Sequence, residues 1–377
     1  MIIGIDISSI AYQTGVSNYT LNLVKNLISI DKKNHYKLFF SSLRLPLPSD
    51  IIKLKNNNNV TIHHFRLPPT LLQILWNRLR LFPIEIFIGK CDIFHTSDWT
   101  QPPTLKAKTI TTIHDLTPFL FPQWHHPKVV NAHHNKMYWA LKKCSCFICV
   151  SQNTFNDLIK LFPKIDRSKI KIIHEAAEDK YKLFQQLPQK TQQQKISSVK
   201  KQYKLNEYIL VQGTREPRKN LDRLVKAFVK FKKENPKNKT QLAVTGKYGW
   251  GQDISSPNSD IKILGFIPEK NMVALHAGAL CLTYPSLYEG FGLPIVKSFT
   301  VGIPVITSNN SSLAEISQDS AILVNPSSVD SIKNAIKKII SSPNLRNELS
   351  KNGVKVAAKF SWQKTAKQTL EVYNSLN

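Results

Sequence analysis

Two adjacent cations stand where a strand-like run gives way to a helix-like one. The segment QGTREPRKNLDRLVKAF places Arg218 and Lys219 between a strand that ends at Gly213 and a helix that begins near Asn220. Arginine offers a planar fork of donors and lysine a compact point charge, so this pair suits a diphosphate. A solvated loop is the alternative interpretation, but the position after a strand favours binding.

A second junction combines an acidic side chain with backbone donors. YPSLYEGFGLPIV is predicted to be a strand, a tight turn and a helix with Pro294 near its first position, where proline is favoured. The N–H groups of Phe291, Gly292 and Leu293 would point out of the helix start, as in anion sites. Beside them, the carboxylate of Glu289 could hold hydroxyl groups or a developing positive charge.

Two further junctions carry weaker signals. In TGVSNY, Gly15 would let backbone N–H groups approach a phosphate at a helix start, although a plain turn explains a single glycine equally well. His114 and Asp115 end the run KTITTIHD. A lone histidine is usually structural, but this one ends a strand on the predicted binding side.

Parallel sheets would bring these junctions together. Short apolar runs alternate with longer amphipathic ones along most of the chain, which is the βαβα pattern of parallel sheets covered by helices. We therefore predict an α/β protein with two doubly wound, Rossmann-like domains, residues 1–185 and 204–360. Ligands of such domains bind outside the carboxyl ends of the strands, here in the cleft between the domains. The polar stretch 186–203 has little core-forming periodicity and is predicted to link them.

The predicted strands are the short apolar runs of this alternation. They are MIIGIDI, HYKLFFS, VTIHHF, CDIFHTS, KTITTIHD, CFICVS and KIKIIHEAA in the first half, and YILVQGT, QLAVTGK, IKILGF, ALCLTYPS, PVITS and AILVN in the second.

The chain has 377 residues and a net charge of +27. A positive charge favours anionic partners, although a bias towards lysine and asparagine would also explain it. The lysines are dispersed and no basic stripe is interleaved with aromatic residues, so nucleic acid is not an expected partner. No apolar run reaches membrane-spanning length. Since MIIGIDIS lacks the features of a signal peptide, we expect a cytoplasmic protein.

Two segments leave alternatives open. TLLQILWNRLRLFPIEIF, residues 70–87, is amphipathic and basic, so it could rest peripherally on the inner face of the membrane or on a lipid acceptor. An ordinary helix that covers a sheet is the alternative.

CSCFIC holds three of the five cysteines, but a metal site would need a fourth ligand and none is obvious. We predict a buried strand there and no metal site.

Taken in order, motifs along nearly the whole chain resemble the retaining glycosyltransferases of family 4, which have the GT-B fold and include mannosyltransferases of polysaccharide assembly. Any one motif is a modest signal, whereas the ordered set is specific. The motifs are IGIDIS…TGVSNYTLNL, CDIFHTSDWTQPP, TTIHDLTP, ICVSQNTFNDL, VQGTREPRKNL, TGKYGW, LGFIPEKNM, YPSLYEGFGLPIV, GIPVITSNNSSLAEI and FSWQKTA.

The resemblance implies a nucleotide-sugar donor on the C-terminal domain and an acceptor mainly on the N-terminal one. It implies that Arg218 and Lys219 neutralise the donor diphosphate and that His114 and Glu289 contact the transferred sugar. Segment 361–377 would be a helix that crosses back to the first domain. The positions assigned to donor binding are Gly15, Gly213, Thr214, Gly246, Ile267, Phe291, Gly292, Leu293 and Lys297.

The implied reaction keeps the configuration of the sugar, and the leaving phosphate takes the acceptor's proton. It needs no cofactor and no metal ion, and the chain contains no Asp-x-Asp motif. Either GDP-mannose or a UDP-hexose could be the donor, and the EPRKN form suggests mannose. The acceptor would be lipid-linked or a polysaccharide, as in lipopolysaccharide biosynthesis. An epimerase of nucleotide sugars would need an acid/base pair beside the sugar, and no convincing pair is found.

One position departs from the family. Its second glutamate, which accepts hydrogen bonds from the ribose, is replaced here by Lys297, eight residues after Glu289. Lysine has no acceptor, so a loss of about 1.5–3 kcal/mol per bond is expected, or about ten- to hundredfold in donor affinity. We also place Lys297 in the first turns of its helix, where a cation opposes the dipole. Lys297 could bind a phosphate, turn to solvent, or mark a non-catalytic partner protein.

Overall fold

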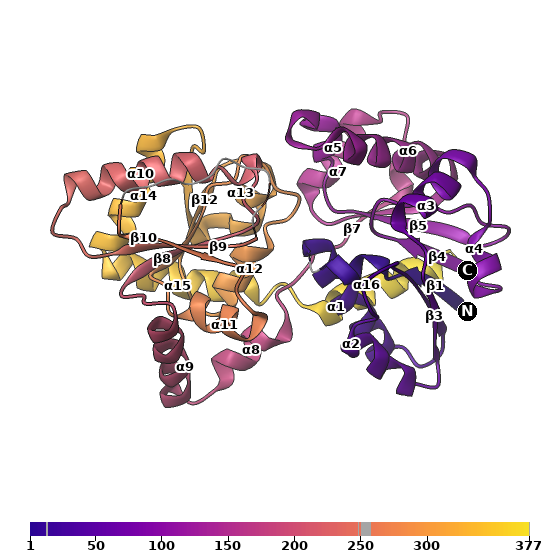
Figure 1. Ribbon diagram of the computed structural model, residues 1–377, viewed down its shortest axis with the longest axis horizontal. Helices are drawn as coiled ribbons and strands as arrows, with labels where there is room; N and C mark the ends of the chain where they lie inside the picture. The colour runs from indigo at the N-terminus through magenta and orange to yellow at the C-terminus, as the bar shows by residue number, and fades with distance from the viewer. Residues whose placement is uncertain (13, 248, 250–257, 377) are drawn as a thin grey trace. The chain divides into compact units, whose positions relative to one another are not determined.

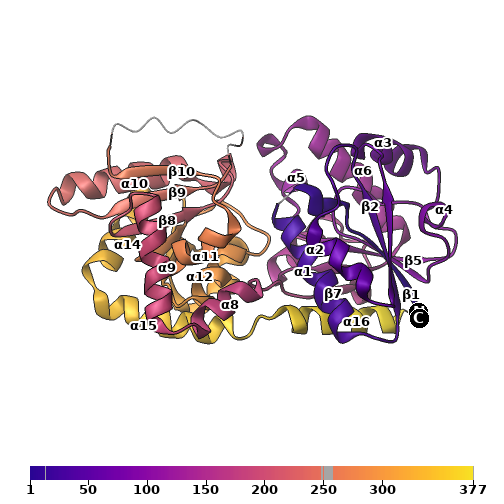
Figure 2. The same ribbon diagram turned by 60° about the horizontal axis from the view of Figure 1, so that its bottom comes forward.

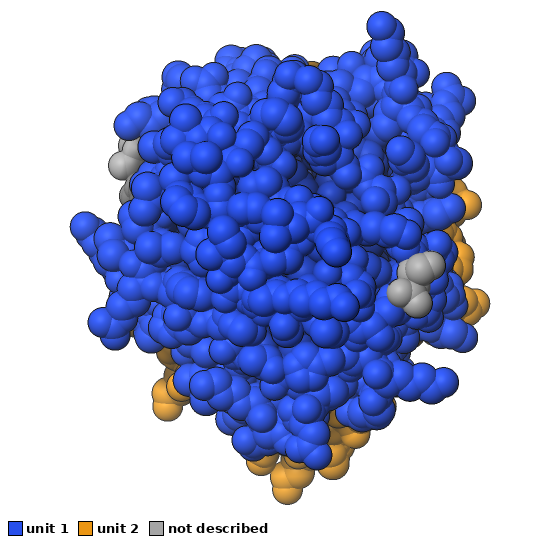
Figure 3. All heavy atoms as spheres, turned by 90° about the vertical axis from the view of Figure 1, so that its right-hand side faces the viewer, with its two compact units in different colours: residues 1–175, 362–377 blue, residues 176–361 orange. Residues whose placement is uncertain are grey.

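The computed structural model describes residues 1–12, 14–247, 249 and 258–376. Tyr248 and Trp250 of the segment TGKYGW lie outside this description. The chain separates into two compact units, residues 1–175 with 362–377 and residues 176–361 (Figure 1; Figure 3, blue and orange). The division at residue 175 differs from the predicted boundary at 185.

The N-terminal unit is built on a seven-stranded parallel sheet, among the residues that the structure describes, in the order β3-β2-β1-β4-β5-β6-β7. Its strands are mostly buried on both faces, which is why they read as nearly continuous apolar runs. They are β1 (Ile2–Asp6), β2 (His35–Ser41), β3 (Val60–Phe65), β4 (Ile93–Thr96), β5 (Lys108–Ile113), β6 (Cys144–Cys149) and β7 (Ile170–Ile172).

Helices flank this sheet, and one of them comes from the far end of the chain. α1 packs against α16, and Tyr373 of α16 contacts His95 with 2.7 Å between Oη and Nδ1. The α-helices are α1 (Gly15–Ile30), α2 (Ser49–Ile52), α3 (Pro69–Gln73), α4 (Ile84–Ile88), α5 (Thr117–Leu120), α6 (Pro127–Lys143), α7 (Gln152–Leu161) and α16 (Trp362–Ser375).

The C-terminal unit repeats this plan with a six-stranded parallel sheet in the described part of the chain, in the order β10-β9-β8-β11-β12-β13. Its core packs the apolar faces of α10 and α14 on the sheet, with Phe228 and Ile336 fully buried. The strands are β8 (Tyr208–Gln212), β9 (Gln241–Thr245), β10 (Ile261–Gly265), β11 (Cys281–Tyr284), β12 (Val305–Ser308) and β13 (Ala321–Val324).

One helix of this unit lies where the sequence predicted a polar linker. Residues 186–203, expected to be a polar linker, contain the whole of α9, which packs against α11 (Figure 2). Its core contact is narrow, Val199 being its buried residue, so the segment shows almost no apolar period. The α-helices are α8 (Asp179–Gln186), α9 (Gln189–Gln202), α10 (Leu221–Glu234), α11 (Glu269–Ala277), α12 (Leu293–Thr300), α13 (Ser311–Ser317), α14 (Val329–Ser341) and α15 (Pro343–Ala357).

The amphipathic segment 70–87, for which one sheet-covering helix was an alternative interpretation, is divided. It becomes α3, the π-helical turn η3 (Ile74–Leu79) and α4. Arg80 and Phe82 adopt positive φ values of 56° and 57° between them. Pro83 follows, and proline disfavours helical geometry in the residue before it. The helix is therefore interrupted, although the amphipathic pattern of the sequence continues through this point.

The strand order of each sheet determines where its loops converge. All of the predicted strands are present, and both orders reverse at one point, between β1 and β4 and between β8 and β11. Adjacent loops diverge at such a switch point and open a crevice at the carboxyl ends of the strands. Arg218 and Lys219 follow β8, and Glu289 follows β11, so the C-terminal unit brings the two strongest sequence signals to one switch point.

Candidate active site

Glu289 is the centre of a buried, charged cluster in the C-terminal unit. Its Oε2 accepts a hydrogen bond from Arg218 Nη1 at 2.6 Å, and its Oε1 accepts one from Lys219 Nζ at 2.6 Å. Tyr284 Oη donates to the same Oε1 at 2.8 Å, while Arg218 Nε donates to Glu216 Oε1 at 2.7 Å. The predicted acid and both predicted cations therefore meet in one network.

The backbone holds the two loops of this cluster together. The N–H of Leu287 donates to the carbonyl of Arg218 at 2.7 Å. Asn220 adopts the left-handed conformation before α10, and its side-chain amide donates to the carbonyls of Pro285 and Pro326. Asparagine tolerates this conformation better than most residues. The RKN segment thus combines the two cations of the cluster with a residue that fixes their loop.

The charges of the cluster shift the pKa values of its members. Burial alone would raise the pKa of Glu289, but Arg218 and Lys219 outweigh it and lower that pKa to about 2. Burial and the charge of Arg218 lower the pKa of Lys219. Glu289 is therefore an ionised acceptor at neutral pH. A bound anion would share the donors that Glu289 occupies here.

Glycines shape the floor of the site. A Cβ at Gly246 would lie 1.8 Å from the carbonyl oxygen of Gly213, and Gly246 has a φ of +134°. No side chain can be placed there, so the ends of β8 and β9 approach closely. Gly292, with a φ of +99°, caps the start of α12. Among the other predicted positions, Thr214 is exposed, whereas Phe291 and Ile267 are buried.

The N-terminal unit holds the predicted residues His114 and Gly15. His114 Nδ1 lies 3.1 Å from Glu175 Oε1, and Tyr19 packs edge-on against the imidazole with 4.6 Å between ring centroids. The other nitrogen, Nε2, is buried with no hydrogen-bond partner among the described residues. Gly15 is the first residue of α1, and no atom lies within 4 Å of where its Cβ would be. Among the described residues, His114 therefore has one ring nitrogen without a hydrogen-bond partner, and Gly15 is next to open space.

Comparison with known proteins decides the family. A family model described as glycosyl transferases group 1 matches residues 192–356, and a model described as glycosyltransferase family 4 matches residues 13–179. Between them, the two matches account for most of the chain. The chain belongs to glycosyltransferase family 4. It is an enzyme that transfers a sugar.

Individual relatives of this glycosyltransferase agree in length and fold. It is 28% identical over 377 residues to O-antigen chain mannosyltransferase B of Escherichia coli, with 96% of each chain covered. Sucrose-phosphate synthase from Thermosynechococcus elongatus aligns with a TM-score of 0.77 at 18% identity, over 100% of this chain and 99% of that one. Anabaena HepE in complex with UDP-glucose gives 0.72 at 16% identity, over 100% of both chains. These likenesses confirm the GT-B fold.

Lys297 of the glycosyltransferase does not lie where the sequence suggested. α12 has only 8 residues, which places Lys297 in its last turn, where a cation is favourable. The prediction of a first-turn position is wrong because the helix stops before Gly302, which has a φ of +71°. The explanation that Lys297 turns to solvent is also wrong, since it is buried and its Nζ lies 2.9 Å from Glu178 Oε1.

The cysteine-rich segment and the possibility of a membrane-spanning helix can be compared with the structure. Cys144, Cys146 and Cys149 are buried in β6, and burial raises the pKa of each thiol. Within the described ranges, no three His, Cys, Asp or Glu side chains are grouped as metal ligands. Nor does any helix there combine the length and apolar character needed to cross a bilayer.

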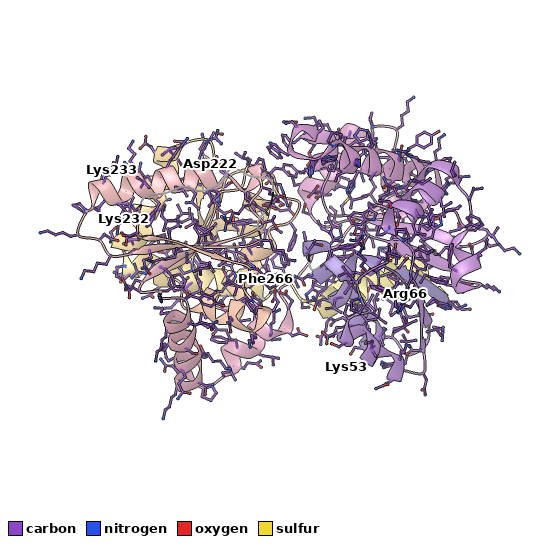
Figure 4. All side chains as sticks on the ribbon, viewed as in Figure 1. Lys53, Arg66, Asp222, Lys232, Lys233 and Phe266 are labelled. Carbon is purple, nitrogen blue, oxygen red and sulfur yellow. The ribbon has the colours of Figure 1, made fainter. Side chains whose placement is uncertain are left out.

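Sequence reasoning missed several residues of the site. Tyr284 is the last residue of β11 and contacts both Lys219 and Glu289, and its place at a strand end was the available signal. Glu178 is separated from Lys297 by 119 positions, so no local pattern could join them. Phe266 follows β10 and is 54% exposed (Figure 4). An exposed aromatic ring at a strand end offers a stacking surface for a base.

Proposed function

We propose that this glycosyltransferase transfers a hexose from a nucleoside diphosphate sugar to a hydroxyl of a lipid-linked or polysaccharide acceptor, with retention of configuration. The observation that carries the proposal is the cluster of Glu289, Arg218 and Lys219 at the switch point of the C-terminal sheet. Two cations and one ionised acid at the carboxyl end of parallel strands suit a diphosphate joined to a polyol.

The chemistry follows from the charges that develop. The bond between the sugar C1 and the β-phosphate oxygen breaks, while a bond forms between C1 and the acceptor oxygen. The acceptor's proton passes to the departing diphosphate. Arg218 and Lys219 stabilise the negative charge of that leaving group, which is the largest contribution such a site can make. Glu289 holds sugar hydroxyls and stabilises positive charge on the ring. No cofactor or metal ion takes part in the proposed reaction.

The donor and acceptor are the finer part of the proposal. GDP-mannose is the preferred donor because a relative that matches 96% of the chain is named an O-antigen chain mannosyltransferase. A UDP-hexose is the second candidate, supported by the complex of HepE with UDP-glucose. A growing O-antigen or a related cell-envelope polysaccharide is the proposed acceptor. We further propose that the enzyme works in the cytoplasm, at the inner face of the membrane.

Calorimetric titration tests this proposal directly. The full chain is titrated with UDP, GDP and ADP, and Arg218→Ala is titrated in parallel. We expect one of the three diphosphates to bind, and to bind at least tenfold more weakly to the variant. GDP would support the mannose donor and UDP the second candidate. If none of the three bound to the folded wild type, the proposed function would be abandoned.

A further inference from the structure

The buried ion pair of Lys297 and Glu178 lies wholly within the C-terminal unit. Lys297 Nζ donates to Glu178 Oε1 at 2.9 Å, and the two side chains are 4% and 9% exposed. Lys180 Nζ approaches the same oxygen at 3.7 Å. Both cations therefore engage one oxygen of the carboxylate. Burial alone would raise the pKa of Glu178, but the charges of Lys297 and Lys180 outweigh it and lower that pKa.

The second carboxylate oxygen of Glu178 is not used by the protein. Oε2 is buried and has no hydrogen-bond partner among the described residues, and the same holds for Tyr181 Oη one helical turn later. A buried acceptor without a partner costs about 1–3 kcal/mol, and more when it is charged. Native structures rarely leave such an atom without a ligand or an ordered water. Glu178 is therefore held by Lys297 through Oε1, while its Oε2 can still accept a hydrogen bond.

Contacts connect this pair to the edge of the sheet where the charged cluster lies. Tyr181 packs edge-on against His276, with 5.5 Å between ring centroids. His276 lies 2.7 Å from Gln212, the last residue of β8, through Nε2, and 2.8 Å from Ser298 of α12 through Nδ1. The helix that carries Lys297 begins beside the Glu289 turn, and four residues of helix rise about 6 Å. The open carboxylate oxygen and the cluster therefore flank the same strand ends.

We propose that Glu178 Oε2 accepts hydrogen bonds from the ribose hydroxyls of the nucleoside diphosphate, and that Lys297 positions Glu178 for this task. The inference rests on the proposed function, because it needs a nucleotide at the C-terminal unit. A carboxylate that binds a ribose 2′-hydroxyl is a general device of doubly wound sheets; here the carboxylate belongs to the residue that precedes α8. Lysine cannot accept a hydrogen bond, so residue 297 acts here through the carboxylate of Glu178.

The test compares ribose with deoxyribose. The full chain is titrated with UDP, GDP and ADP and with the 2′-deoxy and 3′-deoxy forms of whichever binds. We expect the wild type to bind a deoxy form about tenfold or more weakly, because a hydrogen bond to a charged acceptor is lost. In Glu178→Gln this preference should fall several-fold. The double variant Glu178→Leu/Lys297→Met should lose it as well, and an apolar replacement of a buried pair often preserves folding.

The matched control is Glu269→Gln, which removes the other acidic partner of Lys180 at a half-exposed position. It should keep the full preference for ribose. If the wild type bound the ribose and deoxy forms equally, Oε2 would hold only a water and this inference would be wrong, while the proposed function stood. The same conclusion follows if both folded Glu178 variants kept the wild-type preference. Absence of binding by every diphosphate would instead overturn the proposed function and, with it, this inference.

Discussion

Arg218 Nη1 and Glu289 Oε2 lie 2.6 Å apart, and the hydrogen bond between them joins the loop after β8 to the loop after β11. These loops come from the two strands at which the order of the C-terminal sheet reverses. The bond therefore has two effects in the free enzyme. Together with Lys219, it neutralises a buried acid, and it fixes the position of an arginine that suits a diphosphate.

Replacement of this arginine should cost activity. Arg218→Ala removes a donor from the leaving group, and such losses lower kcat by about 10²–10³-fold. Arg218→Lys keeps the charge but loses the fork, so we expect an intermediate rate. The measurement is release of nucleoside diphosphate from GDP-mannose or a UDP-hexose in the presence of acceptor. Lys226→Ala, an exposed position on the following helix, is the control and should leave the rate unchanged. Equal rates in all three variants would remove Arg218 from the mechanism.

Acid should weaken the fold through Glu289. Its pKa is about 2 in the folded protein against an ordinary value of 4.5, so its stabilising effect is complete above pH 4.5 and is lost as the pH falls towards 2. A shift of this size is worth about 3 kcal/mol. We expect the free energy of unfolding of Glu289→Gln to lie below that of the wild type at pH 6. The gap should narrow between pH 4.5 and 2.

Urea unfolding at several pH values measures this effect. The exposed pair of Asp330 and Lys230 provides the comparison, since Asp330→Asn should leave the stability close to that of the wild type at each pH. A difference between Glu289→Gln and the wild type that stayed constant from pH 6 to pH 2 would contradict the assigned ionisation.

The sequence predicted the sheets better than it predicted the connections between their parts. Every predicted strand is present because each carries its own short apolar run, and most of them are buried on both faces. The segment 186–203 failed as a prediction because α9 buries so little of its surface. The helix at 70–87 failed because apolar periodicity does not register a break at Arg80 and Phe82.

The site shows the same division. Arg218, Lys219 and Glu289 could be found because each follows a strand, and parallel strands deliver their carboxyl ends to one edge. Glu178 could not be found from the sequence. Its role depends on the ion pair with Lys297, which lies 119 positions away. The structure thus changes the meaning of Lys297, from a cation in an unfavourable place to one half of a buried pair.

Breaking that pair on one side should destabilise the enzyme. Lys297→Met leaves Glu178 charged and buried, and such losses typically cost 3–5 kcal/mol. Replacing both residues in Glu178→Leu/Lys297→Met should recover most of that loss. Urea unfolding of the three proteins is the measurement, with Lys230→Met at a half-exposed pair as the control, for which less than about 1 kcal/mol is expected. If Lys297→Met were as stable as the wild type, the pair would not be a buried one in solution.

The last prediction concerns membrane contact by the N-terminal unit. Large apolar side chains are exposed between residues 71 and 86, with Ile86 at 63%. Glu85, the acidic residue of this stretch, is turned to the backbone N–H groups of residues 105–107. The exposed charges of this region include Arg66 (Figure 4), Arg78 and Lys90. An apolar surface rimmed by cations suits an anionic lipid surface. The exposed apolar residues are Leu71, Ile74, Leu79, Leu81, Phe82 and Ile86.

Cosedimentation with lipid vesicles tests this contact. We expect the full chain to bind vesicles that contain anionic lipid, to release them as salt is raised, and to bind neutral vesicles weakly, because each cation near such a surface contributes about 1 kcal/mol. Phe82→Ser/Ile86→Ser should reduce binding about tenfold or more, since burial of each side chain is worth about 1.5–3 kcal/mol. Leu183→Ser, at a 58% exposed position of the C-terminal unit, should bind as the wild type does. Equal binding by both variants would show that the lipid contact, if any, lies elsewhere on the chain.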